Sequence, residues 1–498
     1  MRHPEHLTCV HDSGRFSGSE WTLNDLFAIE QVCARHAERY GLDTFPNQME
    51  VITSEQMLDA YVSSGLPVNY GHWSFGKHFL IESGKYRSGA NALAYEIVIN
   101  TNPCIAFLME DNSLAMQTLV IPHACFGHNS FSKGNYLFKQ WTQPDAVLDY
   151  MLFARNYIAE CEERFGFDRV EQTLDALHAL RDQGLDKYKR PRKLDTRKER
   201  AEQAKRLAAA QETMRQAEYY SVVPHAAKAQ QAAAVFPASP EENLLYFIEK
   251  HAPRLEPWQR ELARIVRKIA QYFYPQRQTQ VMNEGWATFW HHRLINDMYD
   301  AGQIDQGILL ECLHSHTNVI RQREYSRLNP YALGFAAWNE IKRVCEFPTA
   351  EDREYLPDIA GKEWLPTFHD IMQNYRDESF LLQFLTPKLV RDFRLMNIQT
   401  REGLDHWTVN DTAGEEGFKS IRSQLAASYR LESMMPEISV VRYGRDSDRK
   451  LTLHHHSYQG RTLADDEAKQ TLKHLRQLWG FDVSLEAVDQ HGATLKTY

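Results

Sequence analysis

Two short segments, about 160 residues apart, place imidazole and carboxylate groups in strongly apolar and aromatic surroundings. The first, residues 121–128, carries two histidines, and the second, residues 283–292, carries Glu284 and two further histidines. Such groups are costly to bury unless they are paired, hydrogen-bonded or bound to a metal. We therefore interpret the two segments as halves of one metal site, which the fold must bring together.

The composition is that of a globular protein. The 498 residues are 43% hydrophobic and 11% aromatic, and the net charge of −9 argues against general nucleic-acid binding. No run approaches 18 apolar residues, and the first residues lack the apolar stretch of a secretory signal. Seven scattered cysteines without a C-x-x-C pair argue against a disulfide framework or a thiolate zinc site. We expect a cytoplasmic protein with no membrane span and no nucleic-acid partner.

Hydrophobic periodicity predicts a mainly helical α+β protein. Expected helices cover residues 20–41, with Thr22 as the cap, then 54–61 and 145–165; two strands lie within 95–110, and Pro122 is well placed to start a helix. We divide the chain into four parts: an N-terminal α+β part with the first histidine segment (1–186), a charged helical excursion and linker (187–240), a helical part with the Glu284 segment (241–385) and a small α+β module (386–498).

Two of these parts offer additional polar clusters. The charged stretch at 187–216 is interpreted as a solvated helical face, because acidic residues intersperse the basic ones; a nucleic-acid patch is the alternative. The C-terminal module is expected to run β-β-α-β-β and carries residues 454–456, three consecutive histidines. Side chains of a strand alternate between its faces, so we expect a polar strand face here and not one shared metal site.

His123 and His128 are five residues apart, which is about 140° around a straight α-helix. The two rings converge only where the helix bulges or breaks, and Gly127 is the natural place. The alternative is a pair of hydrogen-bonded histidines without a metal.

Glu284 and His291 are two helical turns apart and share one face. Gly285 costs this helix roughly 1 kcal/mol relative to alanine, which suggests close approach by another helix or a ligand. His292 points about 100° away and is a weaker candidate. The alternative is an exposed glutamate and a satisfied histidine on an amphipathic helix.

Glu160 is a further candidate ligand or catalytic base. It lies one turn from Tyr157 on the helix expected at 145–165 and pairs with Glu163 at i, i+3. A set of histidine and glutamate ligands suits zinc, iron or manganese, and residue types alone do not choose among them.

Several specific motifs resemble the SpoVR family. They are Val-Ile-Pro-His-Ala-Cys-Phe-Gly-His at 120–128, Tyr-Ile-Ala-Glu-Cys-Glu-Glu at 157–163, Asn-Leu-Leu-Tyr-Phe-Ile at 243–248, Tyr-Phe-Tyr-Pro-Gln at 272–276 and Met-Asn-Glu-Gly-Trp-Ala at 282–287. The resemblance spans nearly the whole chain. It implies a cytoplasmic bacterial protein of stress, stationary-phase or sporulation physiology, in the company of a PrkA-type serine protein kinase and a YeaH/YhbH-type protein. It implies no settled reaction.

The order of elements is also similar to that of zincin metallopeptidases. In many of them a strand pair precedes a helix with two zinc-binding histidines, and a later helix supplies a glutamate ligand. The zincin signature is H-E-x-x-H, whose glutamate activates water. Here Ala124 stands in that place and the histidine spacing is five, so another carboxylate, Glu160 in our interpretation, must serve as the base if there is peptidase chemistry.

The leading hypothesis is a metal-dependent, zincin-like hydrolase. His123, His128 and Glu284 would hold a divalent metal, most simply zinc, with His291 and Glu160 next to them. One alternative is a di-metal carboxylate protein built from Glu160, Glu284, His128 and His291. The other is a non-catalytic regulatory or scaffolding partner of the kinase.

Overall fold

The computed structural model describes most of the chain. The described residues are 15–62, 70–72, 96–185, 208, 212, 236–237, 239–323, 326–395, 398–399, 408–409, 415–430, 435–444, 447–458 and 460–498. Apart from residues 208 and 212, the charged stretch predicted at 187–216 lies outside them, so its predicted helical character stays a prediction.

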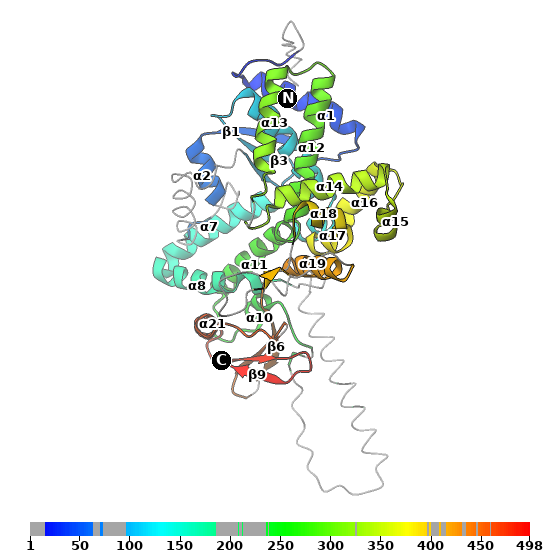
Figure 1. The fold of residues 1–498 in the computed structure, drawn as a ribbon. Helices are drawn as coiled ribbons and strands as arrows, with labels where there is room; N and C mark the ends of the chain where they lie inside the picture. Colours follow the sequence, from blue (N-terminus) through cyan, green and yellow to red (C-terminus); the bar gives the residue numbers. More distant parts are fainter. Residues whose placement is uncertain are drawn as a thin grey trace. The chain divides into compact units, whose positions relative to one another are not determined.

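The chain forms two compact units, and each is built from two separate stretches of sequence. Unit 1 comprises residues 1–160 and 272–430, and unit 2 comprises residues 161–271 and 431–498. Each unit therefore combines segments from more than one of the four parts expected along the sequence. Helices predominate throughout the described residues and the sheets are small, so the protein is a mainly helical α+β protein (Figure 1).

Unit 1 holds a three-stranded sheet and most of the helices. Its strands are β1 (Asn47–Ile52), β2 (Glu96–Ile99) and β3 (Cys104–Met109), with the short pair β4 (Ile398–Gln399) and β5 (Thr408–Val409). Its helices are α1 (Leu23–Arg39), α2 (Ser54–Val62), α4 (Leu114–Ile121), α5 (Asn129–Gly134), α6 (Tyr136–Trp141), α12 (Gln280–Asp300), α13 (Gln306–Val319), α14 (Pro330–Glu346), α15 (Ala350–Tyr355), α16 (Trp364–Asn374), α17 (Asp377–Phe384), α18 (Pro387–Asp392) and α19 (Glu415–Ser428), while α7 (Val147–Phe165) and α11 (Pro257–Gln278) run across the unit boundaries.

The three-stranded sheet has the order β1-β3-β2, with β3 parallel to β1 and antiparallel to β2. Every residue of β3 is buried, as its apolar composition predicts for a central strand. The strand β2 is at the edge and begins with Glu96, which is partly buried. The sheet thereby fixes one carboxylate at the end of an edge strand.

A long helical segment follows the sheet and contains a π-helical stretch. It runs through α4, the π-helix η1 (Pro122–His128) and α5. Pro122 is consequently inside this segment and does not start it, which corrects the sequence prediction; Ser113 caps the segment instead, accepting from the Met116 backbone. Proline has no N–H to donate, and the altered hydrogen-bond pattern of a π-turn is one place where a helix accommodates it. The bulge predicted near Gly127 is thus present.

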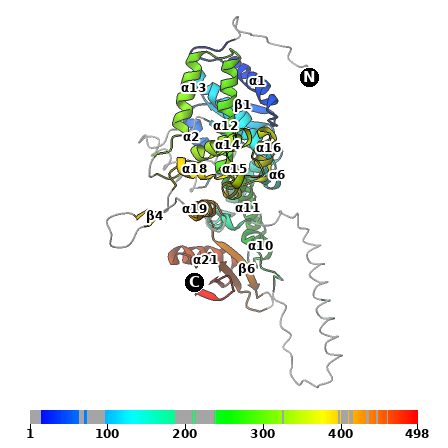
Figure 2. The ribbon, with the colours of Figure 1, turned by 45° about the vertical axis from the view of Figure 1, so that its right-hand side comes forward.

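Helix α12 carries the second polar segment through the centre of unit 1. It runs beside α13 in both views (Figures 1 and 2) and also packs against α14 and η1. Trp286, Trp290 and Phe289 lie in the core. A Cβ atom on Gly285 would lie within 3.0 Å of the Gly334 backbone on α14, so the close helix approach predicted for this glycine is confirmed.

Unit 2 contains a four-stranded sheet with the order β6-β7-β8-β9. Its elements are α8 (Phe167–Ala179), η2 (Arg181–Gln183), α10 (Leu244–His251), β6 (Glu437–Tyr443), β7 (Leu451–His456), α21 (Asp465–Trp479), β8 (Val483–Val488) and β9 (Thr494–Thr497). Burial alternates along β7: His455 is buried, whereas His454 and His456 are only partly buried. The three histidines therefore do not share one face, as alternation predicts.

Several predicted helices of the N-terminal half are confirmed. The Thr22 hydroxyl accepts from the Asp25 backbone and the Asp25 carboxylate accepts from the Thr22 backbone, so α1 begins with the predicted cap. Helices α2 and α7 occupy the expected stretches at 54–61 and 145–165. Of the helices that the structure describes, none is both long and apolar enough to cross a membrane.

Candidate metal centre

The π-helix η1 brings His123 and His128 together. Its i→i+5 hydrogen bonding places residues five apart one above the other, which an α-helix does not do. The two ring centroids are 4.6 Å apart and the rings are nearly perpendicular. Gly127 permits this geometry, because a Cβ atom there would lie 2.5 Å from Cα of Ala287 on α12. The missing Cβ lets η1 and α12 approach closely at the site.

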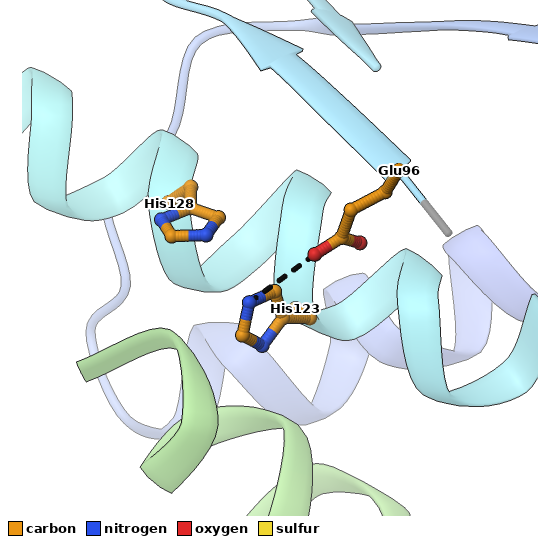
Figure 3. A group of neighbouring side chains, drawn as sticks. All are labelled: Glu96, His123 and His128. Atoms are coloured by element: carbon orange, nitrogen blue, oxygen red, sulfur yellow. Dashed lines mark ion pairs between the residues drawn. The ribbon is translucent and has the colours of Figure 1, made fainter. Parts of the chain in front are cut away.

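A carboxylate faces each of the two histidines. Oε1 of Glu96, from the start of β2, lies 3.2 Å from Nε2 of His123 (Figure 3). Oε2 of Glu284, on α12, lies 3.6 Å from Nε2 of His128. Within the described part of the chain, Glu96, His123 and His128 offer ligand atoms that all lie within 4.8 Å of one another. The site thus gathers two imidazoles and two carboxylates from three elements.

Burial shifts the pKa values of Glu96, Glu284 and His123. It raises the pKa of Glu96 well above its ordinary range, and the neighbouring Glu284 raises it further. Burial also raises the pKa of Glu284, although His128 and a hydrogen bond with Tyr331 oppose this. The pKa of His123 is well below its usual value, first because of burial and then because of His128. A positive charge between the two carboxyl groups would favour their ionised form.

One oxygen of each carboxylate has no hydrogen-bond partner among the described residues. These are Oε2 of Glu96 and Oε2 of Glu284, and both atoms are buried. A buried polar atom without a partner costs roughly 1–3 kcal/mol, and more for a charged group. The donor set therefore fits a divalent cation: two imidazole nitrogens and two carboxylates are the ligands that zinc, iron and manganese take in proteins.

Further hydrogen bonds orient the two histidines. Nδ1 of His128 lies 3.0 Å from Oδ1 of Asn283, which accepts and so leaves Nε2 free for a ligand. Nδ1 of His123 lies 2.8 Å from Nδ1 of His291, whose Nε2 lies 2.8 Å from Nδ1 of His316 on α13. Both nitrogens of His291 are therefore engaged with other rings. Outer partners of this kind set the tautomer and orientation of metal-binding histidines.

The structure brings together four of the five candidate residues. His123, His128, Glu284 and His291 lie in one connected cluster. Glu160 does not join them: its side chain is exposed on α7, and it is not one of the grouped ligand residues among those that the structure describes. Ile158 and Cys161 are buried on the opposite face of α7, so Glu160 lies on the face that is exposed to solvent.

Two residues of the cluster, Glu96 and His316, were not predicted from the sequence as site residues. Glu96 was read only as part of a strand, although a glutamate at the head of an apolar β-branched run was a usable signal. His316 stands in the stretch Leu-His-Ser-His-Thr at 313–317, where nothing in the spacing distinguishes it from an exposed helical residue such as His314.

Comparison with known proteins agrees with the motifs. The model of the family described as "SpoVR like protein" matches residues 20–434, and that of the "SpoVR-like C-terminal domain" matches residues 436–490. The chain is similar to "Uncharacterized protein YcgB" of Escherichia coli (strain K12), with 49% identity over 490 residues, which are 97% of this chain and 96% of that protein. No solved structure matches. The chain belongs to the SpoVR-like protein family.

Proposed function

We propose that the protein is a metal-dependent hydrolase. His123, His128 and Glu284 hold a divalent metal, and zinc is the simplest choice. The observation that carries the proposal is the pair of buried, unpartnered carboxylate oxygens beside two imidazoles whose Nε2 atoms face the carboxylates. Two His and one carboxylate are a ligand set that leaves a position open for water on zinc.

We assign the third ligand to Glu284 and not to Glu96, although the ligand atom of Glu96 lies within 4.8 Å of those of both histidines. A ligand needs a fixed orientation, and Glu284 is hydrogen-bonded to Tyr331 and belongs to the second turn of α12. Glu96 comes from the edge strand and is partly buried there. We propose that Glu96 is the general base, the carboxylate that takes a proton from the attacking water. Ala124 occupies the position of this base in the zincin signature and cannot act as one, and Glu160, the base expected from the sequence, is exposed on α7. A bound metal supplies Lewis-acid activation of that water.

His291 is assigned an orienting role. Its two ring nitrogens contact His123 and His316, which leaves neither for a metal. The di-metal alternative needs Glu160 beside Glu284, His128 and His291, and the exposure of Glu160 speaks against it. The proposed hydrolase belongs to the cytoplasmic stress, stationary-phase or sporulation physiology that the family suggests; a PrkA-type kinase and a YeaH/YhbH-type protein are its proposed partners.

Metal content of the purified full chain tests the ligand assignment. Wild type is expected to carry about one equivalent of zinc, and His128→Ala and Glu284→Gln less than ~0.2 equivalents, because each removes a ligand. His314→Ala is the matched control, since His314 is an exposed histidine of α13. Wild type with less than ~0.2 equivalents would exclude the site.

Glu96→Gln separates metal binding from hydrolysis. The variant is expected to retain zinc while its cleavage of a fluorogenic peptide mixture falls by roughly 10²–10⁴-fold, the usual contribution of a general base. Loss of zinc from this variant would make Glu96 a ligand instead. Zinc binding by wild type without any cleavage, together with kinase co-purification that survives Glu284→Gln, would favour the scaffolding alternative.

A further inference from the structure

Three histidines form a continuous hydrogen-bonded chain that begins at the candidate metal centre. Nδ1 of His123 lies 2.8 Å from Nδ1 of His291, and Nε2 of His291 lies 2.8 Å from Nδ1 of His316. The exposed fractions of the three residues are 5%, 1% and 6%. At that burial the rings of His123 and His291 must satisfy one another, because water hardly reaches them, whereas His316 keeps the largest exposed fraction of the three. The hydrolysis proposed above uses only the first ring directly.

Each nitrogen-to-nitrogen contact needs one protonated and one unprotonated nitrogen, and a neutral imidazole has a proton on only one of its two nitrogens. The chain therefore has two directions. If His123 is protonated at Nε2, its Nδ1 accepts from His291, and His291 accepts from His316. If His123 is protonated at Nδ1, both hydrogen bonds run the other way.

Two acceptors compete for the ring proton of His123. Oε1 of Glu96 lies 3.2 Å from Nε2, and the backbone carbonyl of Ala287 on α12 also hydrogen-bonds to the ring. A cation at Nε2 would end this competition, because a metal-bound nitrogen carries no proton. The remaining proton must then be on Nδ1, on the side of His291.

We propose that His123, His291 and His316 form a tautomer relay, in which a divalent cation at Nε2 of His123 sets the direction of both hydrogen bonds and places the proton of His316 on Nε2. The inference rests on the metal site proposed above. The protons balance: Nε2 of His123 releases one to solvent, the proton of each hydrogen bond crosses to the ring nearer to the cation, and Nε2 of His316 takes up one from solvent. All three rings stay neutral.

The relay gives α13 a role at the site. His316 connects this helix to the ligand His123 through His291. In the cation-bound direction His291 accepts from His123, which strengthens His123 as a ligand, and His316 stabilises His291 in the same way. His291 and His316 are positioning residues in this scheme.

Histidine NMR on the full chain tests the relay. In protein with ¹⁵N-labelled histidine, long-range ¹H–¹⁵N correlations distinguish the two tautomers, and the signals of His316 are identified by their loss in His316→Gln. On addition of zinc alone, the proton of His316 is expected to move from Nδ1 to Nε2. If wild type binds zinc and His316 remains in the Nδ1–H form, the relay is wrong and the metal site stands. If wild type binds no zinc, both are wrong.

A break in the chain is the second test. His291→Leu is expected to abolish the response of His316 to zinc and to weaken zinc binding by about 10–100-fold, the usual effect of losing an outer partner. His292→Leu is the matched control: the His292 ring lies 4.7 Å from that of His316, but His292 hydrogen-bonds to Asn296. Should His291→Leu fail to fold, His291→Gln replaces it. A His316 response that persists without His291 overturns the relay.

Discussion

Gly285 of α12 and Gly334 of α14 meet backbone to backbone. A Cβ atom on either residue would lie within 3.0 Å of the other's main chain, closer than real Cβ contacts come. Glu284 precedes Gly285 directly, and Tyr331, which hydrogen-bonds to Glu284, lies three residues before Gly334. The crossing of two glycines thus positions a carboxylate and the hydroxyl that orients it.

Gly285→Ala is expected to push α12 and α14 apart. The overpacking should lower the free energy of unfolding by on the order of 1–3 kcal/mol, measured by denaturant titration. Because Glu284 moves with the helix, zinc affinity should fall as well. Gly307→Ala in α13 is the control, since its added Cβ would meet only the Asp305 side chain. Equal stabilities of the two variants would contradict this account of the crossing.

Gly127→Ala tests the π-helix separately. Its Cβ would lie 2.5 Å from Cα of Ala287, so η1 must withdraw from α12 and the two histidines must move relative to Glu284. We expect the zinc affinity to fall clearly while the melting temperature changes little. Isothermal titration with zinc beside a melting curve measures both. Unchanged affinity would show that the position of η1 against α12 is not needed for binding.

Asn283→Ala removes the acceptor that faces Nδ1 of His128. His128 then loses its fixed tautomer, and zinc affinity should fall about 10–100-fold with little loss of stability. Asn296→Ala is the control, because Asn296 is on the same helix but hydrogen-bonds to His292. A zinc affinity that equals that of wild type would remove Asn283 from the site.

Asp377 should make stability depend on pH. This buried carboxylate accepts from the backbone of Val281 and Met282 at the start of α12. Burial raises its pKa from 3.8 to about 7, against those hydrogen bonds. A raised carboxyl pKa means that the folded state holds its proton longer, so this group's stabilising contribution is full below pH 4 and is lost as pH rises towards 7.

Relative to Asp377→Asn, wild type should therefore lose stability between about pH 4 and pH 7. Urea unfolding of both proteins across this range, without metal, measures the difference. If the free energy of unfolding of wild type instead rises relative to that of the variant as pH rises, the two backbone hydrogen bonds lower the pKa of Asp377 by more than burial raises it.

Bound zinc should stabilise the folded chain. The side chains of the proposed site (Glu96, His123, His128 and Glu284) meet only in the folded state. Zinc at 100 times its dissociation constant is therefore expected to add about 2.7 kcal/mol to the free energy of unfolding. The melting temperature should rise with zinc in wild type and in His314→Ala, but not in His128→Ala. A rise of equal size in all three would place the zinc elsewhere.

Local patterns in the sequence predicted much of the secondary structure. The cap at Thr22, the strands of β2 and β3 and the bulge near Gly127 are each set by neighbouring residues, so a short window contains their cause. Pro122 misled because proline is commonest at helix starts, whereas here the π-turn admits it within a continuing helix.

The site was only partly predictable because its partners are distant in sequence. Periodicity aligned Glu284 with His291, but it cannot show that Glu96 is opposite His123, since this depends on the edge position of β2. The same holds for the exposure of Glu160, which i, i+3 spacing left undecided. The two discontinuous units likewise follow from long-range contacts that no local pattern encodes.

The discontinuous unit 1 also fixes when the site can exist. His128 and Asn283 are 155 positions apart, and most of the sequence between them belongs to unit 2. At 5–20 residues per second, a ribosome needs roughly 8–30 s to proceed from one to the other. During that interval the histidines of η1 have emerged without α12. The nascent chain must keep this apolar segment from aggregating until α12 is made, and the proposed metal site lacks Glu284 until then.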